Sequence, residues 1–282
     1  MPGPQALSAL SATPPAPRAL IVAVHGGGMH AGYFHPQTDP NLSFLDTCHR
    51  NGFAVLAPDR PGYGDARDAQ LSITEQAACL WSGVRWFREQ HDSSTEVILL
   101  GHSMGAMVAI AMAAMAPPDS LAGLSISGVG EQYRPERQSQ VLPVGDAAPH
   151  RVPAEVWWGD PTLSPAATRD PRVAPLVPVS EADRRESKLW PSMAANLAAG
   201  CQVPVHIVLA ERELWWPAGR AGLDELAALF TSAPWVITEE QRLAAHNVGL
   251  GYAAAAYHLR VLAFAEDCLL SRHHNDAARF IR

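Results

Sequence analysis

A serine flanked by glycines, between an apolar run and a run of small residues, constrains this chain more than any other feature. Residues 97–100 read Val-Ile-Leu-Leu, residues 101–105 read Gly-His-Ser-Met-Gly, and Ala and Met dominate residues 106–116. The pattern predicts a buried strand, a tight turn around Ser103 and then a helix. In such a turn the serine backbone is strained, and the flanking glycines let strand and helix approach closely. The Ser103 hydroxyl would then stand clear of the sheet.

The rest of the chain alternates predicted strands with predicted helices. Apolar, β-branched runs predict strands at residues 20–24, 53–57, 97–100, 121–127, 203–209 and 235–238. Helical spacing predicts helices at residues 74–89, 103–116, 223–230 and 252–270, with Thr74 as the N-cap of the first. Alternation of this kind predicts an α/β fold, with a doubly wound, mostly parallel sheet of about six strands covered by helices on both faces.

The length of 282 residues suits one large domain with a substantial core. We expect a Pro-rich N-terminal segment over residues 1–18 and the main domain over residues 19–282. The interval at about 130–200 is too long for a connecting loop, and its prolines interrupt long helices. It also carries Trp157, Trp158 and Trp190, which are costly to leave in water. We therefore expect an irregular cap insertion over the site.

Charge and composition exclude several classes of partner. The formal net charge is -7, and no basic stripe interleaved with aromatic residues is visible, so we expect a neutral small-molecule substrate and no nucleic acid. Residues 1–18 have neither the basic start nor the apolar stretch of a signal peptide, and no apolar run reaches membrane-spanning length. The expected location is the cytoplasm, without membrane attachment.

The cysteines and the lysine usage carry no mechanistic signal. Cys48, Cys79, Cys201 and Cys268 lack metal-ligand or redox spacing and are expected to be small core residues. Lys188 is the single lysine among 21 basic residues, which with abundant Ala, Pro and Arg suggests a GC-rich bacterial source.

Several motifs, in order, resemble those of the α/β-hydrolase superfamily from about residue 20 to residue 270. Residues 25–28, His-Gly-Gly-Gly, look like the oxyanion loop after the superfamily's third strand. Residues 58–64, Pro-Asp-Arg-Pro-Gly-Tyr-Gly, look like its structural Asp-x-x-Gly-x-Gly turn after the fourth. The N-terminus is short for the superfamily's first two strands, so the sheet is expected to begin at residues 20–24. The resemblance implies that Ser103 is the nucleophile of a serine hydrolase.

A serine hydroxyl at neutral pH needs a base within hydrogen-bond reach. Among 12 histidines, His246 lies between the last predicted strand and the final helix, where the superfamily places its catalytic histidine. His206 lies inside a predicted strand, and His25 and His102 belong to the loop and turn scaffolds. In the polar tail, the adjacent histidines at positions 273 and 274 are expected to be solvated rather than to bind a metal.

The third member of a triad is a carboxylate that accepts from the histidine Nδ1–H. Glu213 occupies the position that follows the strand before the last, where the superfamily often has Gly-x-x-Asp. Glu211 is the alternative if the loop is aligned two residues earlier. Glu131, just beyond the strand over residues 121–127, lies where some members of the superfamily place their acid.

Backbone amides are expected to bind the oxyanion. One donor is the Met104 N–H, and the other comes from the glycine loop, with Gly27 or Gly28 preferred. Aromatic and apolar side chains of the cap and of the loops are expected to contact the substrate; these are Met29, Trp157, Trp158, Trp190, Trp215 and Trp216.

The implied chemistry is acyl transfer through an acyl-enzyme on Ser103, without metal or cofactor. The expected substrate is an ester, lactone or thioester with an apolar, fairly large group. One alternative is an acyltransferase or cyclase with the same triad, for instance in secondary metabolism. Another is a C–C bond hydrolase, which Met29 disfavours because those enzymes have proline there. A third is a non-catalytic ligand-binding member of the fold.

Overall fold

The computed structural model describes residues 6–92, 95–117, 119–141 and 152–280. Residues 1–5 of the predicted N-terminal segment and residues 142–151 of the predicted cap, including Pro143 and Pro149, lie outside these ranges. Seven strands among the described residues form one sheet, in the order β1-β3-β2-β4-β5-β6-β7. Their bounds are β1 Ala9–Ala12, β2 Leu20–Val24, β3 Ala54–Pro58, β4 Val97–His102, β5 Gly123–Ser127, β6 Val205–Arg212 and β7 Val236–Ala245.

The sheet is parallel throughout except at one edge, where β1 pairs antiparallel with β3. The predicted α/β fold with a mostly parallel sheet is confirmed. The strand β1 is additional: it lies in the segment expected to be only Pro-rich, so the sheet begins before residues 20–24. Its burial pattern is three exposed residues and one intermediate, which is why no apolar run marks it in the sequence.

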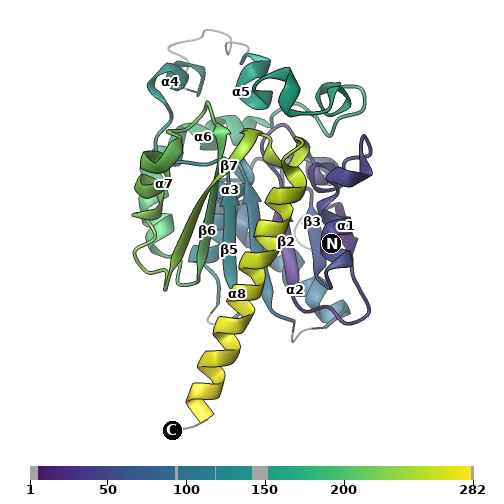
Figure 1. The fold of residues 1–282 in the computed structure, drawn as a ribbon, viewed down its shortest axis with the longest axis vertical. Coiled ribbons are helices and arrows are strands. Elements are labelled where there is room, and N and C mark those ends of the chain that lie inside the picture. The colour runs from purple at the N-terminus through teal and green to yellow at the C-terminus, as the bar shows by residue number, and fades with distance from the viewer. Residues whose placement is uncertain (1–5, 93–94, 118, 142–151, 281–282) are drawn as a thin grey trace.

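Helices cover both faces of the sheet (Figure 1). The α-helices are α1 Phe44–Arg50, α2 Ile73–Gln90, α3 Met104–Ala114, α4 Pro135–Val141, α5 Ala154–Trp158, α6 Glu181–Ala199, α7 Gly219–Ala227 and α8 Ala254–Phe280. Short 3₁₀ helices are η1 Ala31–Phe34, η2 Pro40–Leu42, η3 Gly64–Ala66, η4 Pro161–Leu163, η5 Ala166–Arg169 and η6 Val248–Leu250. The final turns of α8 extend beyond the body of the molecule (Figure 1).

Alternating side chains of the central strands feed two separate cores. On β2, Leu20 and Val22 belong to a core that also includes residues of α2, α3, α6 and α7, whereas Ile21 and Ala23 belong to a core that includes residues of α1 and α8. Every residue of β2, β3, β4 and β5 is buried, as expected for parallel strands covered on both sides. Because these strands are buried on both faces, their apolar runs allowed the strands to be predicted from the sequence.

The N-terminus of α2 differs from the expectation. Ser72, not Thr74, is the N-cap, and its hydroxyl accepts from the backbone N–H of Glu75. The Glu75 carboxylate accepts from the Ser72 N–H in return, which completes a capping box. A Ser-x-x-Glu spacing at residues 72–75 is the sequence signal that identifies this start.

The interval at about 130–200 is less irregular than expected. It holds α4 and α5 at one end of the sheet, at the top of Figure 1, but also the 19-residue helix α6. Buried Trp190, Ala194 and Ala198 of α6 join the core that includes α3. Most prolines of the interval precede α6, and Pro191 is accommodated inside it. The helix α6 therefore belongs to the layer that covers the sheet.

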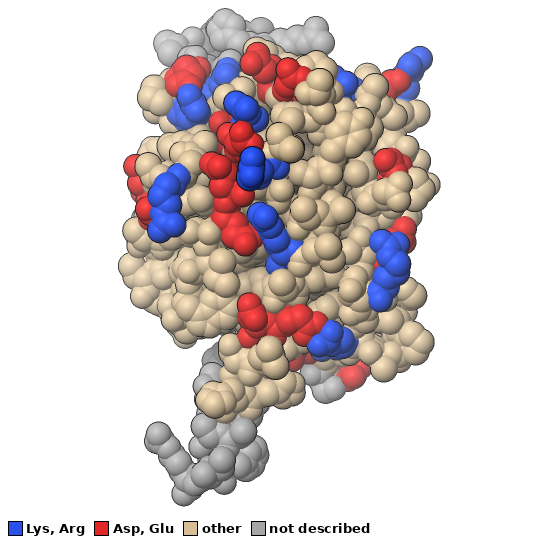
Figure 2. Space-filling model, viewed as in Figure 1, with Lys and Arg blue, Asp and Glu red and all other residues tan. Residues whose placement is uncertain are grey.

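Charged side chains of both signs lie near one another on the face seen in Figure 2, with uncharged surface between the groups. Basic side chains on this face are accompanied by acidic ones rather than gathered in one extended basic patch. Among the described residues, no helix combines the length and the apolar character needed to cross a membrane.

Candidate active site

Ser103 lies at the sharp turn between β4 and α3. Its backbone has φ 55° and ψ -125°, an uncommon conformation for a residue with a side chain. The flanking glycines are required sterically: a Cβ on Gly105 would lie 2.1 Å from the Val24 carbonyl oxygen, and one on Gly101 would lie 2.6 Å from the Ala106 Cα. The turn therefore needs both glycines, and it holds Ser103 at the end of a central strand.

His246 and Glu213 come to Ser103 from the ends of two other strands. His246 directly follows β7, and Glu213 directly follows β6. The His246 Nε2 lies 3.0 Å from the Ser103 Oγ. The His246 Nδ1 lies 2.9 Å from one Glu213 carboxylate oxygen and 3.1 Å from the other. The structure thus brings together the three residues that the sequence predicted as a triad, in one hydrogen-bonded row.

The hydrogen bonds of Glu213 determine which ring nitrogen of His246 carries the proton. The Glu213 Oε1 accepts from the backbone N–H groups of Leu214 and Trp215, at 3.0 and 2.9 Å. A carboxylate so engaged is an acceptor, so the neutral His246 ring carries its proton on Nδ1. The Nε2 lone pair is then directed to the Ser103 hydroxyl. This is the tautomer that a general base for Ser103 requires.

The two alternative acids do not reach His246. The Glu211 Oε2 accepts instead from the Leu243 backbone N–H at 2.8 Å. None of the hydrogen bonds or ion pairs found among the described residues joins Glu131 to His246. Glu213 is 1% and His246 2% exposed, so this contact is screened from water. The geometry therefore favours Glu213 over Glu211 and Glu131.

Two other histidines, His102 and His206, pack and form hydrogen bonds inside the protein core. His102 stacks on Tyr33 with ring centroids 4.8 Å apart, and burial, with the nearby His246, lowers the pKa of His102 well below its ordinary value. His102 is therefore neutral beside His246. His206 lies in β6 and forms a hydrogen bond with Ser125 of β5 at 3.0 Å, as expected for a core histidine.

The glycine loop lies against Ser103 and Met104. A Cβ on Gly26 would be 3.1 Å from the Ser103 Cβ, and one on Gly27 would be 3.2 Å from the Met104 Cγ. The Gly28 N–H is occupied, because it donates to the Tyr63 hydroxyl at 3.0 Å. Of the two glycines expected as oxyanion donors, Gly28 therefore already has a hydrogen-bond partner within the protein. No acceptor for the Gly27 or Met104 N–H is found among the described residues.

Two of the six expected substrate contacts lie beside His246. The Trp157 ring is 5.4 Å from the His246 ring, edge to face, and 4.8 Å from the Trp215 ring. The other four are placed differently. Trp190 and Trp216 are core residues whose indole N–H groups donate to Gly130 and Gly128 carbonyls; Trp158 and Met29 pack in the second core.

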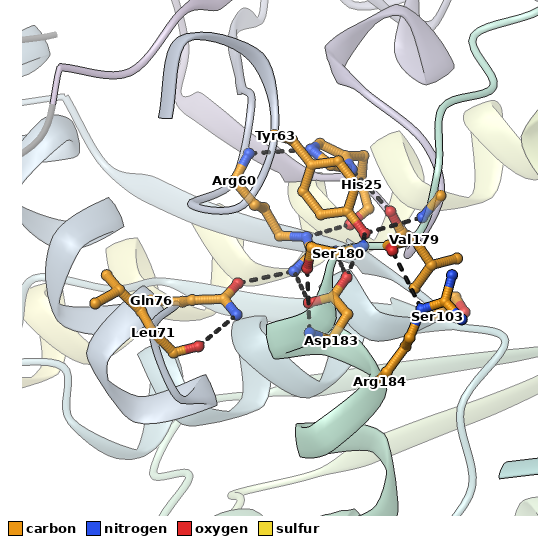
Figure 3. Close-up of polar contacts among 12 residues, drawn as sticks. His25, Arg60, Tyr63, Leu71, Gln76, Ser103, Val179, Ser180, Asp183 and Arg184 are labelled. Atoms are coloured by element: carbon orange, nitrogen blue, oxygen red, sulfur yellow. Dashed lines mark hydrogen bonds and ion pairs between the residues drawn. The ribbon is translucent and has the colours of Figure 1, made fainter. Parts of the chain in front are cut away.

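A buried polar cluster next to the glycine loop escaped the sequence analysis. Its centre is an ion pair between Arg60 and Asp183, joined by Tyr63 and His25 (Figure 3). Arg60 and Tyr63 lie in the Asp-x-x-Gly-x-Gly turn, but Asp183 lies in α6, which was not predicted. Among the described residues, no group of three or more His, Cys, Asp or Glu side chains is arranged to hold a metal ion.

Known proteins resemble this chain in sequence profile and in fold. Residues 21–276 match the sequence profile of a family described as the alpha/beta hydrolase family. Curated protein sequences yield no match.

Solved structures resemble the chain over nearly its whole length. A thermostable carboxyl esterase from Bacillus coagulans is 18% identical, with a TM-score of 0.74, over 94% of this chain and 95% of its own. A monoacylglycerol lipase from Paleococcus ferrophilus is 18% identical, with a TM-score of 0.64, over 94% and 98%. An enol-lactonase from Burkholderia xenovorans is 18% identical, with a TM-score of 0.63, over 92% and 96%. At these identities the likeness shows the fold alone.

Proposed function

The chain belongs to the alpha/beta hydrolase family, and from this premise we propose that it is a serine hydrolase acting through an acyl-enzyme on Ser103. One observation carries the proposal. Ser103, His246 and Glu213 form a continuous row of hydrogen bonds, with the serine held in a strained turn at the end of a central strand. Strained backbone and a nucleophile–base–acid row are features of sites for acyl transfer.

The proposed reaction begins with attack by the Ser103 Oγ on a substrate carbonyl carbon, while the His246 Nε2 takes the hydroxyl proton. Glu213 remains ionised and stabilises the imidazolium that forms. The Met104 and Gly27 N–H groups bind the oxyanion. His246 then gives its proton to the leaving oxygen or sulfur, and the acyl group remains on Ser103.

Deacylation uses the same groups. His246 takes a proton from a water molecule, and the resulting hydroxide attacks the acyl carbon. The second oxyanion occupies the same two amides. When it collapses, the carboxylic acid leaves and the Ser103 oxygen regains its proton from His246. Each backbone N–H that donates to the oxyanion stabilises the transition state by about 3 kcal/mol.

The proposed substrate is an ester, lactone or thioester with an apolar group. Trp157 and Trp215 support this, because they place two aromatic rings next to His246. Among the described residues that contact His246, Glu213 is the only acidic or basic side chain apart from histidine. The three structural relatives are named as an esterase, a lipase and an enol-lactonase. Their named activities share attack on an acyl carbon bonded to oxygen.

The direct test is the intact mass of wild type and Ser103→Ala after exposure to a fluorophosphonate, which phosphonylates activated serines. We expect one adduct on the wild type and none on the variant, because a serine hydroxyl reacts only when a base withdraws its proton. Circular dichroism of both proteins provides the control for folding. Folded wild type without an adduct would contradict the proposal.

A further inference from the structure

An ion pair without access to water lies behind the glycine loop. The Arg60 guanidinium meets the Asp183 carboxylate through two hydrogen bonds, of 3.0 and 2.6 Å, and both side chains are 0% exposed. Burial opposes charge on both groups, but their mutual attraction outweighs it, raising the pKa of Arg60 and lowering the pKa of Asp183. The pair joins the turn after β3 to α6 (Figure 3).

The Tyr63 hydroxyl connects this pair to the loop. It donates to the Asp183 Oδ2 at 2.6 Å and accepts from the Gly28 N–H at 3.0 Å and the Ser180 N–H at 3.3 Å. A phenol has one proton to donate and two lone pairs to accept with, so all three capacities are used. Burial, together with the Asp183 carboxylate, raises the pKa of Tyr63, which keeps the donor proton in place.

The same cluster holds the N-terminal side of the loop. The Arg60 Nε donates to the His25 carbonyl at 2.8 Å, and the Arg60 backbone N–H donates to the His25 Nε2 at 3.0 Å. The His25 Nδ1 therefore carries the proton and donates to the Gly26 carbonyl at 2.8 Å. Burial, with the Arg60 charge, lowers the pKa of His25 to about 3, so the ring is neutral.

These contacts hold the loop on both sides of one amide. The carbonyls of His25 and Gly26 and the N–H of Gly28 are bonded to the cluster, and the Gly28 carbonyl accepts from the Val177 N–H at 2.9 Å. Between them lies Gly27, whose N–H has no acceptor in the described part of the chain.

We infer that Tyr63 and Asp183 are positioning residues for the proposed reaction: they hold the glycine loop so that the Gly27 N–H, rather than that of Gly28, binds the oxyanion. The inference rests on the proposed function.

Electrostatics give the Arg60 contact a second purpose. A Cβ on Gly27 would lie 3.3 Å from the Asp183 Oδ2, so the carboxylate is close to the proposed oxyanion donor. An uncompensated negative charge there would oppose a developing oxyanion, because the Asp183 side chain is buried and solvent screens its charge poorly. The two Arg60 hydrogen bonds and the Tyr63 hydrogen bond balance this charge.

The test uses Tyr63→Phe, which removes the hydroxyl and leaves the Arg60–Asp183 pair intact. Tyr133→Phe is the matched control, since the buried Tyr133 hydroxyl also donates to α6, at the Ser187 carbonyl 3.1 Å away, but none of the hydrogen bonds found among the described residues joins it to the glycine loop. For each protein, the maximal rate of phosphonylation by a saturating fluorophosphonate and its half-saturating concentration are measured as functions of pH.

We expect Tyr63→Phe to lower the maximal rate by about 10- to 100-fold, below or near the effect of deleting one oxyanion donor. The half-saturating concentration and the pH at half-maximal rate should stay as in wild type, because His246 and Glu213 are untouched. Tyr133→Phe should react like wild type. A wild-type maximal rate for folded Tyr63→Phe, or an equal loss in Tyr133→Phe, would overturn the inference alone. Absence of any reaction in wild type would overturn the proposed function and this inference with it.

Discussion

At the residue scale, the candidate site depends on the row of hydrogen bonds that joins Ser103, His246 and Glu213. The glycine spacing predicted the turn around Ser103, and the resemblance to the α/β-hydrolase superfamily implied that His246 and the acid follow the last two strands, whose carboxyl ends meet at one edge of the parallel sheet. The choice among three carboxylates was left open. Only the fold shows that the Glu211 carboxylate bonds to the Leu243 N–H and that Glu213 faces His246.

The structure predicts that Glu213→Ala lowers turnover by about 10³- to 10⁴-fold, since loss of the acid leaves His246 without a partner for Nδ1–H. Glu131→Ala should leave turnover within about twofold, as expected for a residue that does not contact the reacting groups. Hydrolysis of a p-nitrophenyl ester by the two variants measures this. A larger loss for Glu131→Ala would transfer the acid role to Glu131.

At the element scale, long apolar runs were predictable and boundaries were not. The fully buried strands β2 to β5 stood out because apolar and small residues make up all of them except His102, the last residue of β4. The edge strand β1 has no buried face, and α6 follows a proline-rich stretch, so neither carried a clear pattern. Missing α6 also hid Asp183, and with it the cluster behind the glycine loop. A contact between residues 123 positions apart leaves no local signal.

At the scale of the whole molecule, buried neutral histidines link stability to pH. Burial lowers the pKa of His258 to about 3, and His258 lies 2% exposed against Phe44. Between about pH 6.5 and pH 3 the unfolded chain binds a proton at this position and the folded chain does not. The contribution of neutral His258 to the free energy of unfolding is therefore fully present above about pH 6.5 and is lost progressively as the pH drops toward 3.

Replacing His258 with Phe, an aromatic residue that does not titrate, should reduce this acid sensitivity. Between pH 7 and pH 5 the variant should lose about 2 kcal/mol less free energy of unfolding than wild type. His273→Phe is the control, because that histidine is exposed in the final helix. Urea denaturation at the two pH values provides the measurement. Equal acid sensitivity in wild type and His258→Phe would show that His258 is not a buried neutral histidine.

The central claim is that Ser103 and His246 act as one unit, and turnover of Ser103→Ala, His246→Ala and the double variant tests it most directly. With a p-nitrophenyl ester as substrate, each single change should lower kcat by at least about 10⁴-fold, and the double change should lower it no further, because either loss already disables the unit. Losses that multiply in the double variant, or near wild-type turnover in either folded single variant, would contradict the account.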